Sequence, residues 1–316
     1  MQVRPGRTRS HEPGRATLLL PAMSEGNPEQ RAFWNEQAGP IWVENQARLD
    51  EQIRPHGELA LAKLAAAPGE RVLDLGCGCG DTTLALAARV GAEGYVLGVD
   101  ISVPMLARAR ERAAEAGLRQ VEFVAADVQT AALGKGLSPR EAETADFDAA
   151  FSRFGVMFFS APERAFANVR RALRPGGRLG FVCWRAVAEN AWVGVPMRAA
   201  AEVLTLPPPP TPDAPGPFSF ADAARVRRIL EAAGFEAVTL EPADLAMTPA
   251  GGDPDRASEL FLDIGPLGHA LREAGAGPEL RARVREAVRK AFEPHVRAGR
   301  VELGSAVWLV QARRGL

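Results

Sequence analysis

Residues 71–83, RVLDLGCGCGDTT, place an acidic side chain, three glycines and two thiols within one short stretch. An apolar run that contains Asp74 leads into the glycines, which alternate with the cysteines. The residues of this loop are Gly76, Cys77, Gly78, Cys79 and Gly80. Glycine has no Cβ, so such a loop allows the backbone to approach a ligand closely. The ligand could be a metal ion, a dinucleotide, a phosphate group or a smaller molecule.

The sequence does not predict a metal site. Cys77 and Cys79 form a C-x-C pair, but a structural metal site normally has about four ligands. The remaining cysteine, Cys183, and the four histidines are scattered along the chain. We therefore interpret both loop cysteines as small residues that fill a tight turn. A Walker-type phosphate loop is also excluded, because no Lys-Ser or Lys-Thr pair follows the glycines.

A nicotinamide-dinucleotide site is the serious alternative. Its fingerprint is G-x-G-x-x-G at the start of a helix that follows a strand. Here the spacing is G-x-G-x-G, and Asp81 stands where the third glycine would be. A carboxylate directed at the ligand from Asp74 would repel a pyrophosphate and attract a cation. S-adenosylmethionine has a sulfonium and an amino group but no phosphate, which favours it over NAD.

Two further acidic residues follow predicted strands, Asp100 in GVDIS and Asp127 in AADVQT. A carboxylate at Asp100 can accept hydrogen bonds from both ribose hydroxyls, in an NAD or an S-adenosylmethionine site alike. Asp127 could accept from an adenine amino group, with the backbone amide of Val128 against a ring nitrogen. A single Asp after a strand is usually a turn or helix cap. Three at successive strand ends, beside a glycine loop, indicate a nucleoside site.

Alternating strands and helices must position these residues. We predict strands at 71–75, 95–99, 121–125, 147–151 and 178–184, and helices at 81–90, 103–116 and 163–173. This alternation predicts an α/β fold with a parallel sheet covered on both faces, whose ligands bind at the carboxyl ends of the strands. The charged residues of the second helix, Arg112 among them, have the pattern of a solvated face.

The second half of the chain is less regular. We predict partial helix at 185–206 with a boundary or kink at Pro196, a helix at 221–233, strands at 235–240 and 306–312, and one or two helices within 257–292. The domain prediction is a disordered extension (1–27), a helical lid (28–66), a Rossmann-like core (67–184), a substrate cap (185–300) and a final core strand (301–316). Met23 as the natural start is a hypothesis.

Composition narrows the classes of partner. The 38 basic and 39 acidic residues nearly cancel, so no basic excess indicates DNA or RNA as a partner. No apolar run approaches the roughly 18 residues of a membrane span. The three cysteines are few and odd in number, which indicates reduced thiols and a cytoplasmic location. Oligomeric state is not predicted.

The segments LDLGCGCGDTT, GVDIS, AADV, FDAAFSRFGVMFF and LRPGGRLGFVCW resemble the successive motifs of class I S-adenosylmethionine-dependent methyltransferases. The nearest group in texture is that of the ubiquinone/menaquinone-biosynthesis methyltransferases and related bacterial small-molecule enzymes. The resemblance covers residues 28–184 well and the remainder loosely. It implies a doubly wound, mostly parallel seven-stranded sheet with an antiparallel last strand, together with a helical lid and cap.

The resemblance also implies the cofactor site. The methionine half of S-adenosylmethionine would be lined by Asp74, Gly76, Gly78 and Gly80. Asp100 would hold the ribose, Ile101 would lie against the adenine, and Met105 would pack near both. The adenine edge would be recognised by Ala126, Asp127 and Val128, and Ser152 would lie close to the methyl group.

Catalytic residues are less evident. Methyl transfer needs alignment and exclusion of water, and a general base only where the acceptor must lose a proton. Ser152 and Arg153 are weak candidates, and Arg153 either binds an acidic substrate group or forms an ion pair. His56 and His269 are candidates only by residue type, and each is more often a surface or structural histidine. Trp184 and Trp192 could flank a flat or lipophilic substrate.

The predicted function is therefore transfer of a methyl group from S-adenosylmethionine to a small organic molecule. Two alternatives stay open at this point. One is a non-catalytic S-adenosylmethionine-binding module, which the missing base permits. The other is an NAD-dependent oxidoreductase, which the glycine spacing disfavours.

Overall fold

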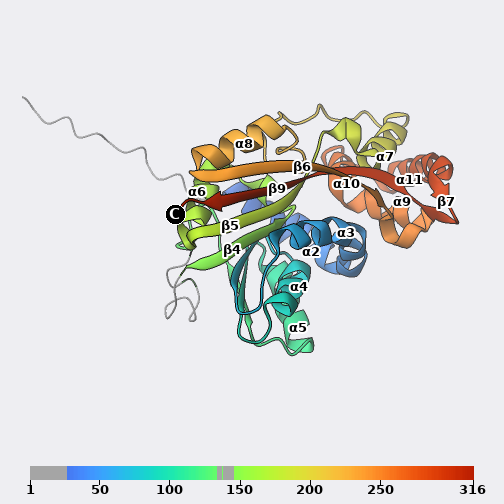
Figure 1. Cartoon of the computed structure of the whole chain (residues 1–316). Coiled ribbons are helices and arrows are strands. Elements are labelled where there is room, and N and C mark those ends of the chain that lie inside the picture. Colours follow the sequence, from blue (N-terminus) through green and yellow to red (C-terminus); the bar gives the residue numbers. More distant parts are fainter. Residues whose placement is uncertain (1–26, 134–136, 138–145) are drawn as a thin grey trace, which may run out of the picture.

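A seven-stranded sheet forms the centre of the computed structural model, which describes residues 27–133, 137 and 146–316 (Figure 1). Its strands are β1 (Arg71–Leu75), β2 (Tyr95–Asp100), β3 (Val121–Ala125), β4 (Phe147–Arg153), β5 (Leu173–Trp184), β6 (Phe235–Met247) and β9 (Leu303–Arg314). The predicted disordered extension and the start at Met23 lie outside the described residues, except for Asn27.

The strand order is β3-β2-β1-β4-β5-β9-β6. Strands β1 to β5 run parallel, and β9 runs antiparallel to both β5 and β6. This confirms the predicted doubly wound sheet with an antiparallel last strand. The order reverses between β1 and β4, so the carboxyl ends of these two strands frame the crevice where sheets of this type bind ligands.

Helices cover both faces of the sheet and also pack beside its extended end. They are α1 (Pro28–Ala32), the π-helical turn η1 (Phe33–Gln37), α2 (Ala38–Glu44), α3 (Gln46–Leu64), α4 (Asp81–Val90), α5 (Val103–Glu115), α6 (Pro162–Ala172), α7 (Ala191–Ala201), α8 (Ala223–Ala232), α9 (Pro254–Asp263), α10 (Gly265–Glu273) and α11 (Pro278–Phe292). Helices α3, α4 and α5 lie on one face and α6 and α8 on the other (Figure 1). In α4, Leu86 and Val90 are four apart and fully buried, as the apolar spacing predicts.

Strands β6 and β9 continue past the end of β5. Trp184, the last residue of β5, pairs with Val307, whereas the β6–β9 ladder runs on to the pair of Met247 and Leu303. Helices α7, α9, α10 and α11 pack together beside this extension (Figure 1). A two-stranded sheet of β7 (Val296–Arg297) and β8 (Arg300–Val301) lies next to α9.

The second half differs from the sequence predictions in two places. Three helices, not one or two, occupy the region predicted from 257–292. Helix α7 also continues through Pro196, so of the predicted boundary or kink at this residue the boundary is wrong. Proline removes one helical hydrogen bond, but the buried side chains of Val193 and Val195 before Pro196 and of Ala199 and Ala200 after it keep the helix packed.

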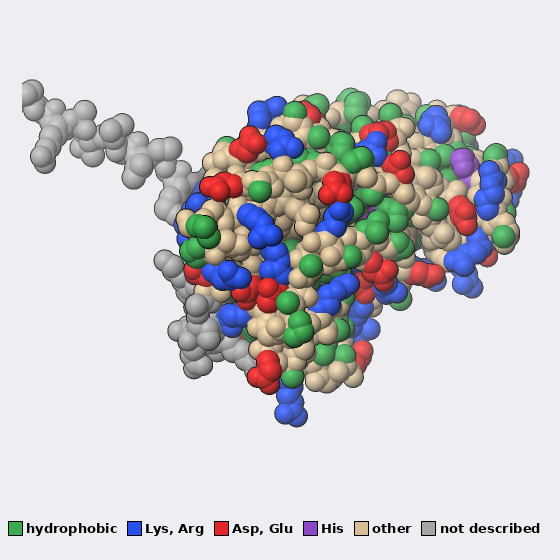
Figure 2. All heavy atoms as spheres, in the orientation of Figure 1, with side chains coloured by type: hydrophobic (Ala, Val, Ile, Leu, Met, Phe, Trp, Pro, Cys, Tyr) green, Lys and Arg blue, Asp and Glu red, His purple; other side chains and the backbone are tan. Residues whose placement is uncertain are grey.

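The surface carries charges of both signs. Acidic and basic side chains intermingle over the face drawn in Figure 2. Within the described ranges, the helices are all too short or too polar to cross a membrane.

Candidate cofactor site

The end of β1 buries a carboxylate that keeps one oxygen free of partners. Asp74 is 0% exposed, and its Oδ2 accepts hydrogen bonds from the hydroxyls of Thr82 (2.8 Å) and Thr83 (2.6 Å). Its Oδ1 has no hydrogen-bond partner among the residues that the structure describes. Burial raises the pKa of Asp74 to about 6, although both threonine hydroxyls act to lower it. A buried oxygen of this kind is suited to a donor or cation from outside the protein.

The glycine loop after β1 is packed at distances that exclude side chains. Gly76 has φ +63°, and a Cβ added there would lie 2.8 Å from the Cα of Gly155. Gly78 has φ +54°, and its added Cβ would lie 2.9 Å from Cε of Met105. Backbone conformation therefore favours glycine at both positions, and the backbone of Gly155 also leaves no space for a side chain at Gly76. The loop turns tightly between the exit of β4 and helix α5.

Asp100, at the end of β2, is joined to the same loop. Its Oδ2 accepts from the backbone amide of Gly78 and its Oδ1 from that of Ser102, each at 2.8 Å. Burial raises its pKa, which these backbone amides counteract. Each carboxylate oxygen can accept more than one hydrogen bond, so these contacts leave capacity for a ligand hydroxyl. Met105 is 5% exposed and packs on this loop.

Asp127 follows β3, where the resemblance implies an adenine site. It is 6% exposed, and its Oδ2 accepts from the backbone amide of Asn27 at 2.7 Å. Its Oδ1 accepts from the amide of Gln129 at 2.9 Å. Its neighbours Ala126 and Val128 are buried as well. The structure thus pairs Asp127 with the first described residue of the N-terminal segment.

The N-terminal segment continues across the ends of β2 and β4. The ring of Trp34 meets Phe158 edge-on, with centroids 5.0 Å apart, and the Trp34 carbonyl accepts from the hydroxyl of Ser102 at 2.8 Å. Asn35 donates to the carbonyl of Ile101 and accepts from the amide of Val103, both at 2.9 Å. Helix α1, turn η1 and helix α2 therefore cover the residues that the sequence assigns to the ribose and adenine.

Ser152 and Arg153, the catalytic candidates, lie at the end of β4. The Ser152 hydroxyl is 0% exposed, donates to the carbonyl of Leu75 at 2.7 Å and links β4 to β1. Arg153 forms ion pairs with Asp81 (2.7 Å) and Asp50 (3.0 Å). Both ends of its guanidinium are therefore engaged within the protein.

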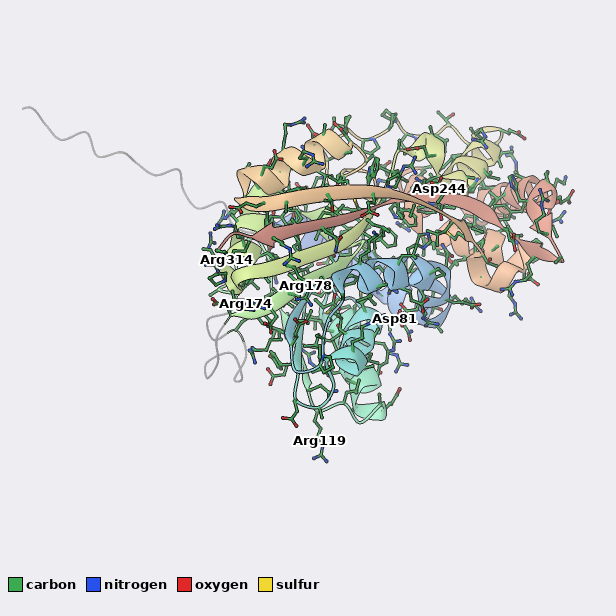
Figure 3. The ribbon with its side chains drawn as sticks, viewed as in Figure 1. Asp81, Arg119, Arg174, Arg178, Asp244 and Arg314 are labelled. Carbon is green, nitrogen blue, oxygen red and sulfur yellow. The ribbon has the colours of Figure 1, made fainter. Side chains whose placement is uncertain are left out.

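Arg153 belongs to a largely buried ion-pair network. The sequence suggested an ion pair as one alternative for Arg153 but indicated neither its partners nor the part of Arg112. Arg112 also pairs with Asp50 (3.0 Å) and Asp81 (3.2 Å), and donates to the carbonyl of Cys79 at 2.7 Å. The Arg112 side chain is only 14% exposed, so the prediction that it lies on a solvated face is wrong. Figure 3 shows Asp81 where α3 and α4 meet. The network joins α3 to the glycine loop and to β4.

The loop cysteines behave as packing residues. Cys77 and Cys79 are buried and unpaired, and burial raises the pKa of both thiols, that of Cys79 to about 12. A protonated thiol is a poor metal ligand. Within the described ranges, no three His, Cys, Asp or Glu side chains come together as a metal site would require.

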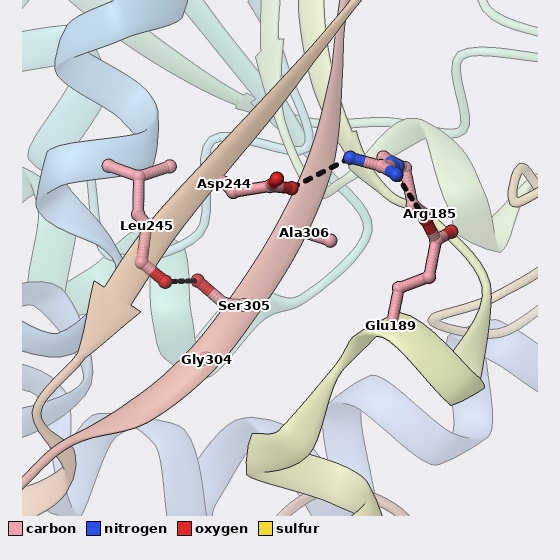
Figure 4. Close-up of a pocket in the computed structure, with 7 residues that line it drawn as sticks. All are labelled: Arg185, Glu189, Asp244, Leu245, Gly304, Ser305 and Ala306. Carbon is pink, nitrogen blue, oxygen red and sulfur yellow. Dashed lines mark hydrogen bonds and ion pairs between the residues drawn. The ribbon is translucent and has the colours of Figure 1, made fainter.

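A surface cavity of about 380 Å³ opens beyond the end of β5 (Figure 4). Arg185 lies on its wall and pairs with Asp244 at 2.7 Å and with Glu189. The guanidinium of Arg185 is therefore neutralised by two carboxylates. None of the lining residues belongs to the glycine loop or to the strand-end acids.

A sheet of this order, with a glycine loop after β1 and acidic residues near the ends of β1, β2 and β3, is typical of Rossmann-like domains that bind a nucleoside cofactor. The family comparison is more specific, because residues 72–177 match the family described as "Methyltransferase domain". This region is therefore similar to the class I S-adenosylmethionine-dependent methyltransferases, whose cofactor is S-adenosylmethionine.

Known relatives agree with this assignment. Aklanonic acid methyltransferase DauC of Streptomyces sp. (strain C5) is 36% identical over 113 residues, which are 36% of this chain and 47% of the relative. The 2-phytyl-1,4-naphtoquinone methyltransferase of Trichormus variabilis is 35% identical over 132 residues, 42% of this chain and 54% of the relative. The chain thus matches about half the length of these relatives.

Solved structures share the fold. Phosphoethanolamine N-methyltransferase 2 of Haemonchus contortus, in complex with S-adenosyl-L-methionine, superposes with a TM-score of 0.53 at 16% sequence identity. The match covers 90% of this chain and 60% of that one. At this identity the likeness concerns the fold alone.

Proposed function

We propose that this protein transfers the methyl group of S-adenosylmethionine to a small organic acceptor. The observation that carries the proposal is the buried, unpartnered Oδ1 of Asp74 beside the glycine loop. The donor chemistry of this site fits the cationic end of S-adenosylmethionine. It does not fit a dinucleotide, because a pyrophosphate on the loop would face this carboxylate.

The proposed roles of the residues follow their positions. Asp74 would hold the cofactor's amino group, Asp100 the ribose, and Asp127 with the Val128 amide the adenine edge. Ser152, at the end of β4, would lie close to the methyl group, which the bound cofactor supplies in electrophilic form. The protein's own contribution is then alignment and exclusion of water, and the N-terminal segment over the strand ends is suited to the latter.

The acceptor and its reacting atom are tested by turnover. The purified protein is incubated with S-adenosylmethionine and a panel of oxygen, nitrogen, carbon and sulfur acceptors, including ring systems suggested by the relatives' names. Formation of S-adenosylhomocysteine and of a product heavier by one methylene is followed by mass spectrometry. Turnover excludes the non-catalytic module, whereas cofactor binding without any turnover on a broad panel favours it.

We further infer a reducing, cytosolic location. Support comes from Cys77, Cys79 and Cys183, all buried and unpaired. Cysteines without a disulfide partner are usual in a reducing compartment.

Cofactor affinity is expected to fall about tenfold between pH 7 and pH 5 because of Asp74. Its pKa of about 6 means that the carboxylate is protonated across the lower part of this range, and only the ionised form attracts the cofactor's ammonium. The stability of the ligand-free protein changes with pH in the opposite direction. Because the pKa of Asp74 is raised from 3.8 to about 6, its contribution to the free energy of unfolding declines as pH rises through this range. Calorimetric titration at several pH values measures the first effect.

Two comparisons isolate the Asp74 contribution. Asp74→Asn should bind S-adenosylmethionine weakly, with a much smaller pH dependence. Methylthioadenosine, which lacks the amino-acid part, should bind the wild type with little change over the same range. If methylthioadenosine shows the same tenfold change, a group other than Asp74 is responsible.

A further inference from the structure

Arg112, on α5, donates a hydrogen bond to the backbone of the glycine loop. Its Nη1 lies 2.7 Å from the carbonyl oxygen of Cys79. Ala109, three residues earlier on the same helix, lies against Gly80, where an added Cβ would be 3.0 Å from the Cβ of Ala109. Residues three apart share one face of a helix. One face of α5 therefore supports the loop at residues 79 and 80.

The peptide between Cys79 and Gly80 has little conformational preference of its own. Gly80 has φ +82° and ψ 10°, and glycine adopts positive and negative φ about equally well, so rotation of this peptide plane costs little backbone energy. Two hydrogen bonds oppose the rotation. One runs from the Gly80 amide to the carbonyl of Cys77 at 2.9 Å and closes a turn within the loop. The other, from Arg112, ties the peptide to a helix outside the loop.

Two largely buried carboxylates orient the guanidinium of Arg112. The side chain of Asp50 is 2% exposed and accepts from Nη1 at 3.0 Å, and that of Asp81 is 13% exposed and accepts from Nη2 at 3.2 Å. Asp50 is itself held by the amide of Gln46 at 2.6 Å and by Arg153 at 3.0 Å. The N–H groups of a guanidinium form a rigid planar fork. With both carboxylates bound, the second N–H of Nη1 is directed at the Cys79 carbonyl.

We infer that Arg112 is a positioning residue, which sets the affinity for S-adenosylmethionine by holding the Cys79–Gly80 peptide in the orientation that the methionine half of the cofactor requires. It acts through the loop and not through a contact with the cofactor. A loop that is already ordered loses less conformational entropy when a ligand binds. The inference rests on the proposed function, because that function places the methionine half on this loop. The adenosine half, proposed to lie at Asp100 and Asp127, should be insensitive to Arg112.

The test compares two ligands that differ in the amino-acid part. S-adenosylhomocysteine carries this part and methylthioadenosine lacks it. In calorimetric titrations, Arg112→Lys should weaken the binding of S-adenosylhomocysteine by about fivefold or more and that of methylthioadenosine by less than about twofold. Lysine keeps a cation between Asp50 and Asp81, but a single ammonium cannot reproduce the fork that also reaches the carbonyl. Arg112→Met should show the same selective loss, and if it does not fold, Arg112→Lys decides alone.

Arg54→Met is the matched control. Arg54 pairs with Oδ1 of Asp81 at 3.3 Å, the same oxygen that Arg112 contacts. Within the described part of the chain it makes no hydrogen bond to the glycine loop. This variant should leave both affinities within about twofold of the wild type, because it removes a cation beside Asp81 without releasing the Cys79 carbonyl.

Three results would overturn the inference. A merely structural Arg112 would change the melting temperature and weaken both ligands alike, or would leave both affinities unchanged. An equal loss of S-adenosylhomocysteine affinity in Arg54→Met would show that charge beside Asp81, and not the carbonyl contact, controls binding. Failure of the wild type to prefer S-adenosylhomocysteine over methylthioadenosine is a different outcome, which would contradict the proposed function and the inference with it.

Discussion

The Gly76→Ala variant is expected to lose about 2–5 kcal/mol of unfolding free energy and, with it, the cofactor site. Gly76 has φ +63°, which costs a residue with a Cβ about 1–2 kcal/mol. The new methyl would also lie 2.8 Å from the backbone Cα of Gly155, and overpacking of this kind typically costs about 1–3 kcal/mol. Relief requires the glycine loop to move away from the exit of β4. Urea unfolding measures the stability, and calorimetry with S-adenosylmethionine measures the site.

Gly69→Ala separates strain from collision. Gly69 has φ +82°, but an added Cβ there meets nothing within 4 Å. This variant should lose only the conformational part, about 1–2 kcal/mol, and retain cofactor affinity. Equal losses of stability in the two variants would show that the close approach of Gly76 to Gly155 has no energetic consequence.

The Arg153→Met variant is expected to be less stable by about 3 kcal/mol, because it leaves Asp50 and Asp81 buried with one cation fewer. The side chains of Arg153 and Asp50 are 9% and 2% exposed, so solvent cannot replace the lost pairing. The exposed pair of Arg174 with Asp148 provides the control, and Arg174→Met should cost less than about 1 kcal/mol. Urea unfolding of both variants gives the comparison.

A double-mutant cycle with Asp50→Asn tests the pairing itself. The two substitutions together should cost less than the sum of the single losses, because the second removes a charge that the first left unpaired. If Arg153→Met retains full stability and only raises KM for an acidic acceptor, Arg153 binds substrate and the ion-pair assignment is wrong.

The sheet and the glycine loop could be predicted because their signals are local. The apolar run at 71–75, the glycines after it and the amphipathic helix at 81–90 each lie within a few residues, and the structure places β1 and α4 there. Strand β6 extends past Leu240 to Met247 although polar residues interrupt its sequence. Its pairing with β9 over that length sustains the strand, and no local pattern reveals such pairing.

The sequence suggested an ion pair as one alternative for Arg153, but the members of the network could not be predicted because they are far apart in sequence. Asp50 pairs with Arg153, 103 residues away, and with Arg112, 62 residues away. The alternating charges around Arg112 have the same pattern as a solvated helix face. His56 is a similar case, since its hydrogen bond is with Ser305, 249 residues further along the chain. The cofactor roles of the strand-end acids stay predictions.

Calorimetric titration of S-adenosylmethionine into the wild type and Asp100→Ala tests the cofactor assignment most directly. Asp100 accepts from the Gly78 amide and is proposed to hold the ribose, so its loss removes both contacts. We predict micromolar binding by the wild type and at least tenfold weaker binding by the variant, or about 1.4 kcal/mol. Equal affinity in the two proteins, or no binding by the wild type with acceptors present, would contradict the assignment.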